Sequence, residues 1–538
     1  MQSTAFRRID DILRHGAVHR PDAPALVEDG RTWSYAALAA AADAHAALLR
    51  ELGVRPGDRV MLVAENGVAQ VALLFAAAAI DAWSVGVNAR LSEGELATIR
   101  AHSGARRVLY VTGNSPDAAR HAARAGALPC GDCPGAVMAG PLDGACTPEP
   151  VDADGDQVAA LVYTTGTTGQ PKGVMLSHAS LLFVAATSSR LRGLVHGDRA
   201  WGGLPISHVY GLTSVLLGTL YAGACLHLAP RFDAAALLAS IRAGELTIVQ
   251  GVPAMYARLL AIMDEETRTV PSRLRFCYAG GSPLDPSLKR AVEARFGLPL
   301  HNGYGLTECG PTVSQTRLDP PRGDTSVGLP IPGVAVRIVD RDGHDVAPGD
   351  PGELWVRGPG TMRGYYRDPA ASGAVLRPGG WLATGDLARQ DPDGALFLLG
   401  RTRELIIRSG FNVYPVEVET ALNAHPAVVQ SAVVGRPLPG AEEEVVAYVE
   451  AHGVDEAALQ AWLTARLAPY KRPARIVFLD ALPAAPSGKV LKRQLPHVVS
   501  ARAGTQVSPT SAASSSRNRD RSRRHPDAPP RPDAPNTW

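Results

Sequence analysis

The sequence lacks the features that mark secreted, membrane-spanning or nucleic-acid-binding chains. Six cysteines in 538 residues are too few for a disulfide framework. The longest apolar stretch, residues 71–80, is too short to span a bilayer and is typical of a buried helix. The formal net charge is only +2, which predicts neither a nucleic-acid partner nor an acidic membrane surface. We therefore expect a cytoplasmic protein without a transmembrane segment.

Three familiar motifs are also missing. No string fits the Walker A pattern G-x-x-x-x-G-K-[ST]. Cys130 and Cys133 form a C-x-x-C pair, but no second pair or histidine doublet completes a zinc site. The residues before Pro21 carry charges throughout and lack the apolar core of a secretory signal. The cysteines are thus expected to be reduced and the chain to carry no signal peptide.

The most informative segment is residues 163–173, YTTGTTGQPKG, which follows the strand-like run 158–162. Its glycines let the backbone approach a ligand closely, and its threonines and N–H groups can donate to phosphate oxygens. Lys172 adds a positive charge. The pattern predicts a loop for a nucleoside triphosphate, and a flexible surface loop is the alternative. The binding candidates are Thr164, Thr165, Gly166, Thr167, Thr168 and Gly169.

A second candidate string, NGYGLTE at residues 302–308, follows the strand-like segment 298–301. Tyr304 offers an aromatic face to a base, and Asn302 offers an amide to the edge of adenine. Thr307 offers a hydroxyl to phosphate, and Glu308 offers a hard oxygen ligand to Mg²⁺. The alternative is an ordinary glycine-rich turn with a solvated glutamate.

Strand-like runs alternate with helical ones along most of the chain. Short strands are predicted at residues 59–64, 107–112, 247–251 and 274–279. This alternation predicts an α/β fold with layered, mostly parallel sheets. The composition of residues 134–155 predicts a loop between subdomains, and the short β runs of residues 333–357 predict a β-rich subdomain.

The character of the sequence changes near Gly400. Strands are predicted at residues 428–435 and 445–450, and an amphipathic helix at residues 455–467. The Ser-, Arg- and Pro-rich residues after about 499 predict a disordered tail. The expected division is a large part before residue 400, a compact unit from about residue 400 to 497 and a tail at 498–538.

The two strings resemble the phosphate loop and the Y-G-x-T-E motif of the adenylate-forming superfamily, whose members include acyl-CoA synthetases, peptide-synthetase adenylation domains and luciferases. The family loop usually has serine at the position of Thr165, and threonine keeps the hydroxyl. The resemblance extends over about residues 21–496. It implies a large N-terminal domain of several subdomains at residues 1–399, a hinge at 400–403 and a small, mobile α+β C-terminal domain at 404–497.

Further motifs carry the resemblance in the N-terminal part. Thr384-Gly385-Asp386 looks like the family's T-G-D, which places Asp386, with Arg401 nearby, at the ribose hydroxyls. Gly280 and Gly281 belong to a segment that lines adenine and the acyl pocket in the family. The string LPISHVYG at residues 204–211 places His208 at the mouth of that pocket, with a buried structural histidine as the alternative.

The C-terminal part resembles the family as well. The family's hinge position falls on Arg403, and Gly410 matches a glycine that lines the pantetheine tunnel. Lys489, in the string PSGK, matches a lysine that bridges the acyl carboxylate and the α-phosphate. Lys471 is a candidate for the phosphates of CoA, although a solvated surface charge explains it about as well.

The resemblance implies a two-step ligase that uses ATP, Mg²⁺ and coenzyme A, with an acyl-AMP intermediate. Its implied catalytic residues are Lys172, Lys489, Thr307, Glu308 and His208. The apolar surroundings of the motifs favour a fatty or aromatic acid, while Arg231 leaves a dicarboxylic acid open. A separate carrier protein in place of CoA, a nucleotide-binding homologue without activity, and a homodimer also stay open.

Overall fold

The computed structural model describes residues 6–131, 134–152, 154–165, 171–263, 273–408, 411–438, 443–484 and 490–495. The chain divides into two compact units, residues 1–492 and 493–538. The described residues form five sheets, all of them in the first unit.

A seven-stranded sheet with a parallel centre carries the first candidate loop. Its strands lie in the order β6 (Leu128–Pro129), β7 (Val137–Ala139), β5 (Arg107–Val111), β3 (Arg59–Ala64), β4 (Trp83–Asn88), β8 (Val158–Thr165) and β9 (Pro171–Ser177). Strands β5, β3, β4 and β8 are parallel to their neighbours in this set, and β9 returns antiparallel to β8. Every residue of β3 is buried, as expected for a parallel strand with both faces covered.

The described N-terminal part contains the helices α1 (Ile9–His19), α2 (Tyr35–Glu51), α3 (Val68–Ala79), α4 (Glu93–Ser103) and α5 (Pro116–Arg124). Of these, α3, α4 and α5 contact strands of the seven-stranded sheet. The alanine-rich α3 is buried along nearly its whole length, which confirms the expectation for residues 71–80. Helix α2 begins at Ser34, whose side chain accepts a hydrogen bond from the backbone of Ala37 and so caps the helix.

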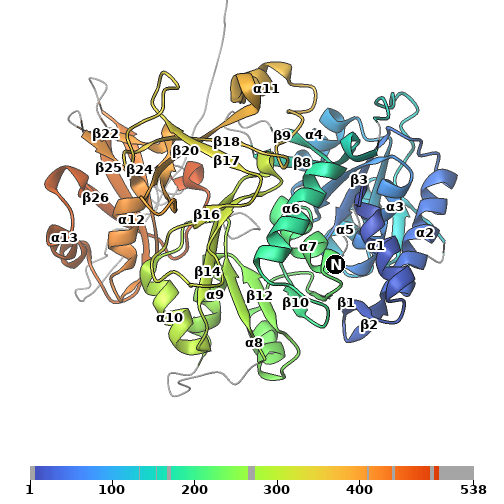
Figure 1. The fold of residues 1–538 in the computed structure, drawn as a ribbon, viewed down its shortest axis with the longest axis horizontal. Coiled ribbons are helices and arrows are strands. Elements are labelled where there is room, and N and C mark those ends of the chain that lie inside the picture. The colour runs from blue at the N-terminus through green and yellow to red at the C-terminus, as the bar shows by residue number, and fades with distance from the viewer. Residues whose placement is uncertain are drawn as a thin grey trace, which may run out of the picture. The chain divides into compact units, whose positions relative to one another are not determined.

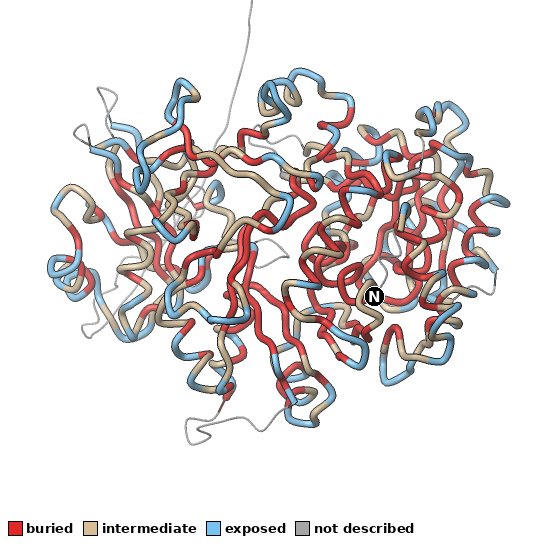
Figure 2. Tube along the Cα trace, in the orientation of Figure 1, coloured by how far each residue is buried: buried red, intermediate tan, exposed pale blue. Residues whose placement is uncertain are grey.

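A nine-stranded sheet carries most of the remaining candidates. Its order is β16 (Leu329–Pro330), β15 (Thr312–Gln315), β14 (Leu300–Gly305), β13 (Phe276–Ala279), β12 (Ile248–Gly251), β10 (Arg199–Gly202), β11 (Cys225–Leu228), β1 (Pro24–Glu28) and β2 (Arg31–Ser34). Strands β14 to β1 in this order are parallel, and the outer pairs are antiparallel. Figure 2 shows the central strands as buried, in agreement with the uninterrupted burial of β12 and β13.

Helix α6 (His178–Leu191) follows β9 directly and runs between the two large sheets (Figure 1). The chain continues through β10 into a π-helical segment, Tyr210–Leu217, which packs on α6. The other helices of this region are α7 (Gly218–Tyr221), α8 (Ala234–Arg242), α9 (Pro253–Ala261) and α10 (Pro286–Phe296).

The later parts of the chain form smaller sheets. An antiparallel sheet contains β17 (Ala335–Val339), β18 (Gly352–Arg357), β19 (Leu376–Arg377), β20 (Trp381–Gln390) and β21 (Leu396–Arg401), with α11 (Pro369–Val375) beside β19. Beyond it lie β22 (Ile406–Arg408), β23 (Phe411–Val413), α12 (Pro415–Asn423), β24 (Val428–Pro437), β25 (Glu443–Ala451), α13 (Glu456–Thr464) and β26 (Arg475–Phe478). These last elements enclose a hydrophobic core of their own.

The expected α/β fold with a β-rich part and a small α+β part is therefore confirmed. The structure differs at two places. Residues 134–155 are not only a loop, because β7 lies within them and pairs with β5. The strands before both candidate strings are longer than expected, so that Thr164 lies in β8 and residues 302–305 lie in β14.

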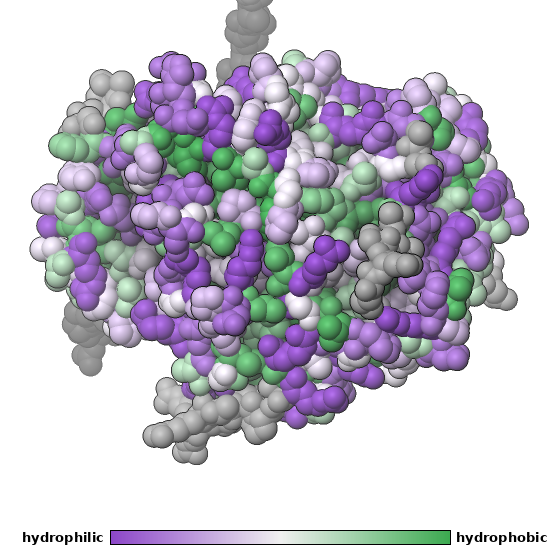
Figure 3. All heavy atoms as spheres, in the orientation of Figure 1, coloured by the Kyte–Doolittle hydropathy of each residue, from purple (hydrophilic) through white to green (hydrophobic). Residues whose placement is uncertain are grey.

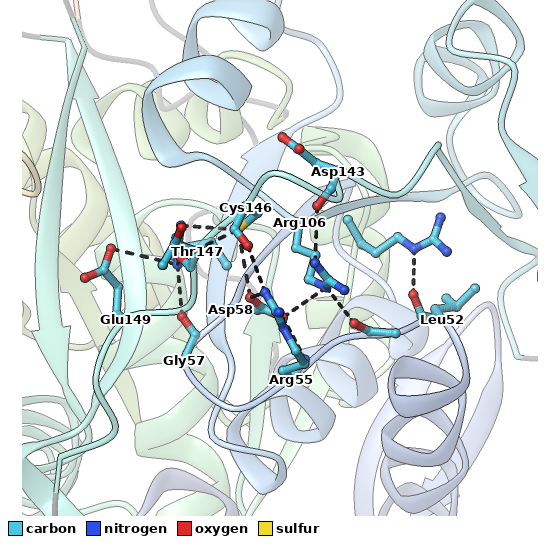
Figure 4. Close-up of polar contacts among 12 residues, drawn as sticks. Leu52, Arg55, Gly57, Asp58, Arg106, Asp143, Cys146, Thr147 and Glu149 are labelled. Atoms are coloured by element: carbon cyan, nitrogen blue, oxygen red, sulfur yellow. Dashed lines mark hydrogen bonds and ion pairs between the residues drawn. The ribbon is translucent and has the colours of Figure 1, made fainter.

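A buried polar network fixes the segment before β8 to the start of β3 (Figure 4). The fully buried Asp58 accepts a hydrogen bond from Nε of Arg55 at 3.1 Å and pairs with Arg106 at 3.2 Å. Arg55 also donates to the carbonyl of Cys146 at 2.8 Å. Next to Asp58, Gly57 has a φ of +80°, and a Cβ there would lie 2.0 Å from the carbonyl oxygen of Glu149.

No helix of the described residues is long and apolar enough to cross a membrane. On the face drawn in Figure 3, hydrophilic and hydrophobic residues are interspersed.

We expect Asp58→Ala to destabilise the protein by about 3 kcal/mol, because two arginines lose their buried carboxylate. The exposed pair of Glu93 with Arg124 provides a matched control, and Glu93→Ala should cost less than about 1 kcal/mol. Urea unfolding followed by circular dichroism measures both shifts. Equal midpoints for the two variants would contradict the importance of the network.

Candidate active site

The β8–β9 hairpin presents Lys172 beside the ends of the glycine- and threonine-rich loop. The strand register places Thr164 opposite Lys172, and Thr165 opposite Pro171. Gly166, Thr167, Thr168 and Gly169 lie outside the described residues, as does the side chain of Thr165.

Tyr365 connects the hairpin to the second candidate string. Its hydroxyl donates to Oε1 of Glu308 at 2.7 Å, and Nζ of Lys172 lies 4.6 Å from the centre of its ring. Burial and then the Glu308 carboxylate raise the pKa of Tyr365, so the phenol stays a protonated donor. A cation and a carboxylate from distant parts of the chain therefore meet on one aromatic side chain.

Backbone pairing holds Tyr365 in this place. Met175 of β9 donates to the carbonyl of Gly364, and Arg363 donates back to Met175, both at 3.0 Å. The N–H of Met362 donates to the carbonyl of Glu308 at 2.8 Å. The segment around residues 362–365 thus fastens β9 to the short 3₁₀ turn Thr307–Cys309, in which Thr307 is buried next to Glu308.

Asp386 lies where three segments meet. The register of β20 and β21 sets it opposite Arg401, whose Nε lies 3.1 Å from Oδ1 of Asp386. The hydroxyl of Tyr304, from β14, donates to Oδ2 at 2.6 Å. Burial and then the charge of Asp386 raise the pKa of Tyr304, which keeps this donor protonated. The sequence candidates Tyr304, Asp386 and Arg401 are thus in direct contact.

The amide of Asn302 is already engaged within the protein. Its Nδ2 donates to the backbone carbonyls of Thr325 and Ser326 at 3.1 and 3.2 Å, while its Oδ1 accepts from the N–H of Gly303. Asn302 therefore joins β14 to the segment before β16.

Tyr210 links the histidine string to the two candidate glycines. The exposed His208 precedes the π-helical segment, and its Nδ1 accepts a hydrogen bond from the backbone of Tyr210 at 3.3 Å. A Cβ on Gly280 would lie 3.2 Å from the Tyr278 ring and 3.6 Å from the Tyr210 ring. Gly281 has a φ of +81° and also faces Tyr210. The structure therefore brings the histidine motif against the turn after β13.

Other candidates are paired elsewhere or lie outside the described residues. Nζ of Lys471 is 2.6 Å from Oε1 of Glu417, within the C-terminal elements. Gly410 and Lys489 are not among the described residues. Arg231 already pairs with Glu65 at 2.8 Å and with Asp117 at 2.7 Å, so its charge is neutralised by the chain itself.

Reasoning from the sequence did not single out two residues near the site, Tyr365 and Arg192. Tyr365 lies in a Gly-Tyr-Tyr string, which is conspicuous in a chain with only 5% aromatic residues, but nothing local indicates its partners. Arg192 follows the apolar helix α6 and is almost completely buried against Tyr278. A charged residue at the end of an apolar helix was the available signal.

Comparison with known proteins identifies the family of this chain. The AMP-binding enzyme family matches residues 13–366, and the AMP-binding enzyme C-terminal domain matches residues 417–489. The chain is 37% identical over 481 residues to a feruloyl-CoA synthase of an Amycolatopsis species, covering 88% of this chain and 96% of the relative. It is 34% identical over 505 residues to a sulfoacetate–CoA ligase of Cupriavidus necator, covering 91% and 97%.

Solved structures show the same similarity. ATP-bound MatB of Rhodopseudomonas palustris superposes with a TM-score of 0.81 at 30% identity, covering 92% of this chain and 99% of MatB. MenE of Bacillus subtilis, an o-succinylbenzoate-CoA synthetase in complex with ATP and magnesium, gives a TM-score of 0.78 at 30% identity, covering 90% and 99%. The family match and the fold define an adenylate-forming enzyme. The chain belongs to the AMP-binding enzyme family, in its acyl-CoA synthetase branch, which uses ATP, Mg²⁺ and CoA.

We expect Tyr304→Phe to lower the stability by about 2 kcal/mol, because the buried Asp386 loses a charge-assisted hydrogen bond. The ring and its packing are retained in this variant. Thermal unfolding measures the change, and an unaltered midpoint would show that Arg401 alone satisfies the carboxylate.

Proposed function

We propose that this chain is a carboxylic acid–CoA ligase that activates an aromatic acid. In the first step the acid's carboxylate attacks the α-phosphorus of ATP, giving acyl-AMP and pyrophosphate. In the second step the thiol of CoA attacks the acyl carbonyl, and AMP leaves. The observation that carries the proposal is the convergence of Lys172 and Glu308 on Tyr365.

The described side chains fit the needs of the first step. Lys172 is proposed to neutralise charge that develops on phosphoryl oxygens, and Thr307 to donate a hydroxyl to them. A carboxylate oxygen is a ligand that Mg²⁺ prefers, so Glu308 fits the role of metal ligand. When bound, Mg²⁺ supplies Lewis-acid stabilisation of the phosphates. Tyr365 orients the Glu308 carboxylate through its hydroxyl.

Other candidate residues are proposed to hold the nucleoside, the triphosphate and the acid. Asp386 and Arg401 are proposed to hold the ribose hydroxyls, and Tyr304 to face the base. The segment with Gly280 and Gly281 is proposed to leave room for adenine and the acyl group. The glycine- and threonine-rich loop, with Thr164 and Thr165 at its start, is proposed to hold the triphosphate. His208 is proposed to border the reacting carbonyl.

The second step is proposed to need the C-terminal elements. We infer a domain at residues 404–497 that rotates about residues 400–403 on the N-terminal domain, residues 1–399. Lys489 then acts in the adenylation step, while Gly410 and Lys471 contact CoA. Residues 498–538 are assigned no role in either step. We further infer a cytoplasmic location, and we retain a homodimer as the assembly to be tested.

The similarity to a feruloyl-CoA synthase supports an aromatic acid. Tyr210 and Tyr278 also favour it, because flat rings can pack against these tyrosines across Gly280. The side chains of Tyr210 and Tyr278 are both buried.

The test is ATP- and Mg²⁺-dependent pyrophosphate release across aromatic and fatty acids, with and without CoA. We expect release with aromatic acids, and acyl-CoA together with AMP once CoA is added. Pyrophosphate without acyl-CoA would instead identify a carrier-protein thiol as the acceptor. Bound ATP with no pyrophosphate from any acid would refute the proposed ligase.

We expect Tyr365→Phe to weaken Mg²⁺ binding by roughly tenfold, because a metal-binding carboxylate depends on its hydrogen-bond partner for orientation. The variant keeps the ring that Lys172 contacts. Calorimetric titration of Mg²⁺ in the presence of a non-hydrolysable ATP analogue measures the affinity. Tyr366→Phe is the matched control, since the hydroxyl of Tyr366 donates to Glu149 at 2.5 Å, away from Glu308. Indistinguishable affinities for both variants would count against the role of Tyr365.

A further inference from the structure

Arg192 is a buried cation without a carboxylate partner. It is 1% exposed and caps the C-terminal end of α6. Its Nε donates to Oε1 of Gln315 at 3.3 Å and its Nη1 to Oε1 of Gln250, and its guanidinium lies 4.1 Å from the centre of the Tyr278 ring. Within the described part of the chain, no carboxylate forms an ion pair with it. Burial of a charge without a counter-charge is costly, so this arrangement requires an explanation.

The other fully buried arginine shows what a structural role looks like in this fold. Arg59 donates to four backbone carbonyls and to the thiol of Cys146, and it lies 3.8 Å from the Glu149 carboxylate. Among the described residues Arg192 has only neutral partners, which are two amides and the side chain of Tyr278. Its positive charge is therefore left uncompensated by the described residues, whereas that of Arg59 is not.

Two neighbouring side chains also have unused donors. Oε1 of Gln250 accepts from Arg192, but Nε2 of the same amide has no hydrogen-bond partner among the described residues. Ser188 lies one turn before Arg192 on α6, hence on the same face of the helix, and its hydroxyl is likewise unpartnered there. Both residues are fully buried. Arg192 and Gln250, which share a hydrogen bond, suit an acceptor that carries negative charge, and Ser188 adds a buried hydroxyl at the same end of α6.

These donors lie next to the proposed acyl space. The Tyr278 ring that Arg192 contacts also borders Gly280, and its hydroxyl lies 1.9 Å from the position of a Cβ on Gly303. Tyr210 adjoins Tyr278 with a ring-centre separation of 6.4 Å and follows His208 by two residues. Arg192 is thus separated from the two glycines by a single aromatic ring, and its partner Gln315 lies opposite Gly303 on the neighbouring strand.

We propose that Arg192, with Gln250 and Ser188, is the subsite for the far end of the acid, and that the substrate carries a second, anionic acceptor group there. The group is a carboxylate or a sulfonate. This inference rests on the proposed ligase function and makes its substrate class more specific. Arg192 then determines specificity, because a buried charge without its partner penalises every acid that lacks the second group.

The test compares acids that share one skeleton. Benzoate, 3-hydroxybenzoate, isophthalate and 3-sulfobenzoate form an aromatic set, and pentanoate and glutarate form an aliphatic pair. Their binding to the full-length protein with a non-hydrolysable ATP analogue is measured by calorimetry, and kcat/KM is measured from pyrophosphate release. We expect an acid with a distal anion to exceed its unsubstituted partner at least tenfold in affinity and in kcat/KM.

Arg192→Met is expected to abolish this preference and to lower kcat/KM for the distal anion by about 30-fold or more, with the KM for ATP unchanged. Arg192→Lys, which keeps the charge, should retain part of the preference. Arg231→Met is the matched control, because that cation is already paired with Glu65 and Asp117, and it should leave the preference unaltered.

Two results would overturn the inference. One is a wild-type protein that binds and activates the unsubstituted acids as well as the anionic ones. The other is an Arg192→Met variant that loses activity equally for all acids, which would assign Arg192 a purely structural role. Failure of the ligase function is distinct, since it appears as ATP binding with no pyrophosphate from any acid.

Discussion

The arrangement of the site depends on one buried carboxylate, Asp386. Its two oxygens are occupied by Tyr304, from the nine-stranded sheet, and by Arg401, from the strand beside it in the antiparallel sheet. Because a buried carboxylate is costly without donors, the three segments that supply it with contacts are held together. The proposed nucleoside residues therefore come from two sheets, yet they form one cluster whose geometry does not depend on a ligand.

How far the sequence predicts the site depends on whether a contact is local. The glycine- and threonine-rich string and the NGYGLTE string were recognisable because glycines that allow close approach stand beside donors of suitable chemistry in one short stretch. The pairing of Asp386 with Arg401 follows from the register of a hairpin-like strand pair. Tyr365 and Arg192 could not be assigned in this way, since their partners lie far away in sequence and are brought near only by the folded sheets.

The fold was predictable to a similar degree. The apolar strands β3, β12 and β13 were found because parallel strands buried on both faces appear as short continuous apolar runs. Strand β7 was missed because its three residues lie among glycines and prolines that indicate a loop, and only its pairing with β5 makes it a strand. The length of β8 was underestimated because only its pairing with β9 makes the threonines at its end part of the strand.

The pairing of β1 with β11 has a consequence for synthesis of the chain. Leu26 lies beside Leu226, so the first strand belongs to a sheet whose neighbouring strand is made much later. Translation proceeds at about 5–20 residues per second, so roughly 10–40 seconds pass on the ribosome before β1 can reach its partner. During that time β1 has only the hairpin with β2, and an isolated two-stranded hairpin is marginally stable. The N-terminal hairpin therefore stays only marginally stable until the residues of β11 have been made.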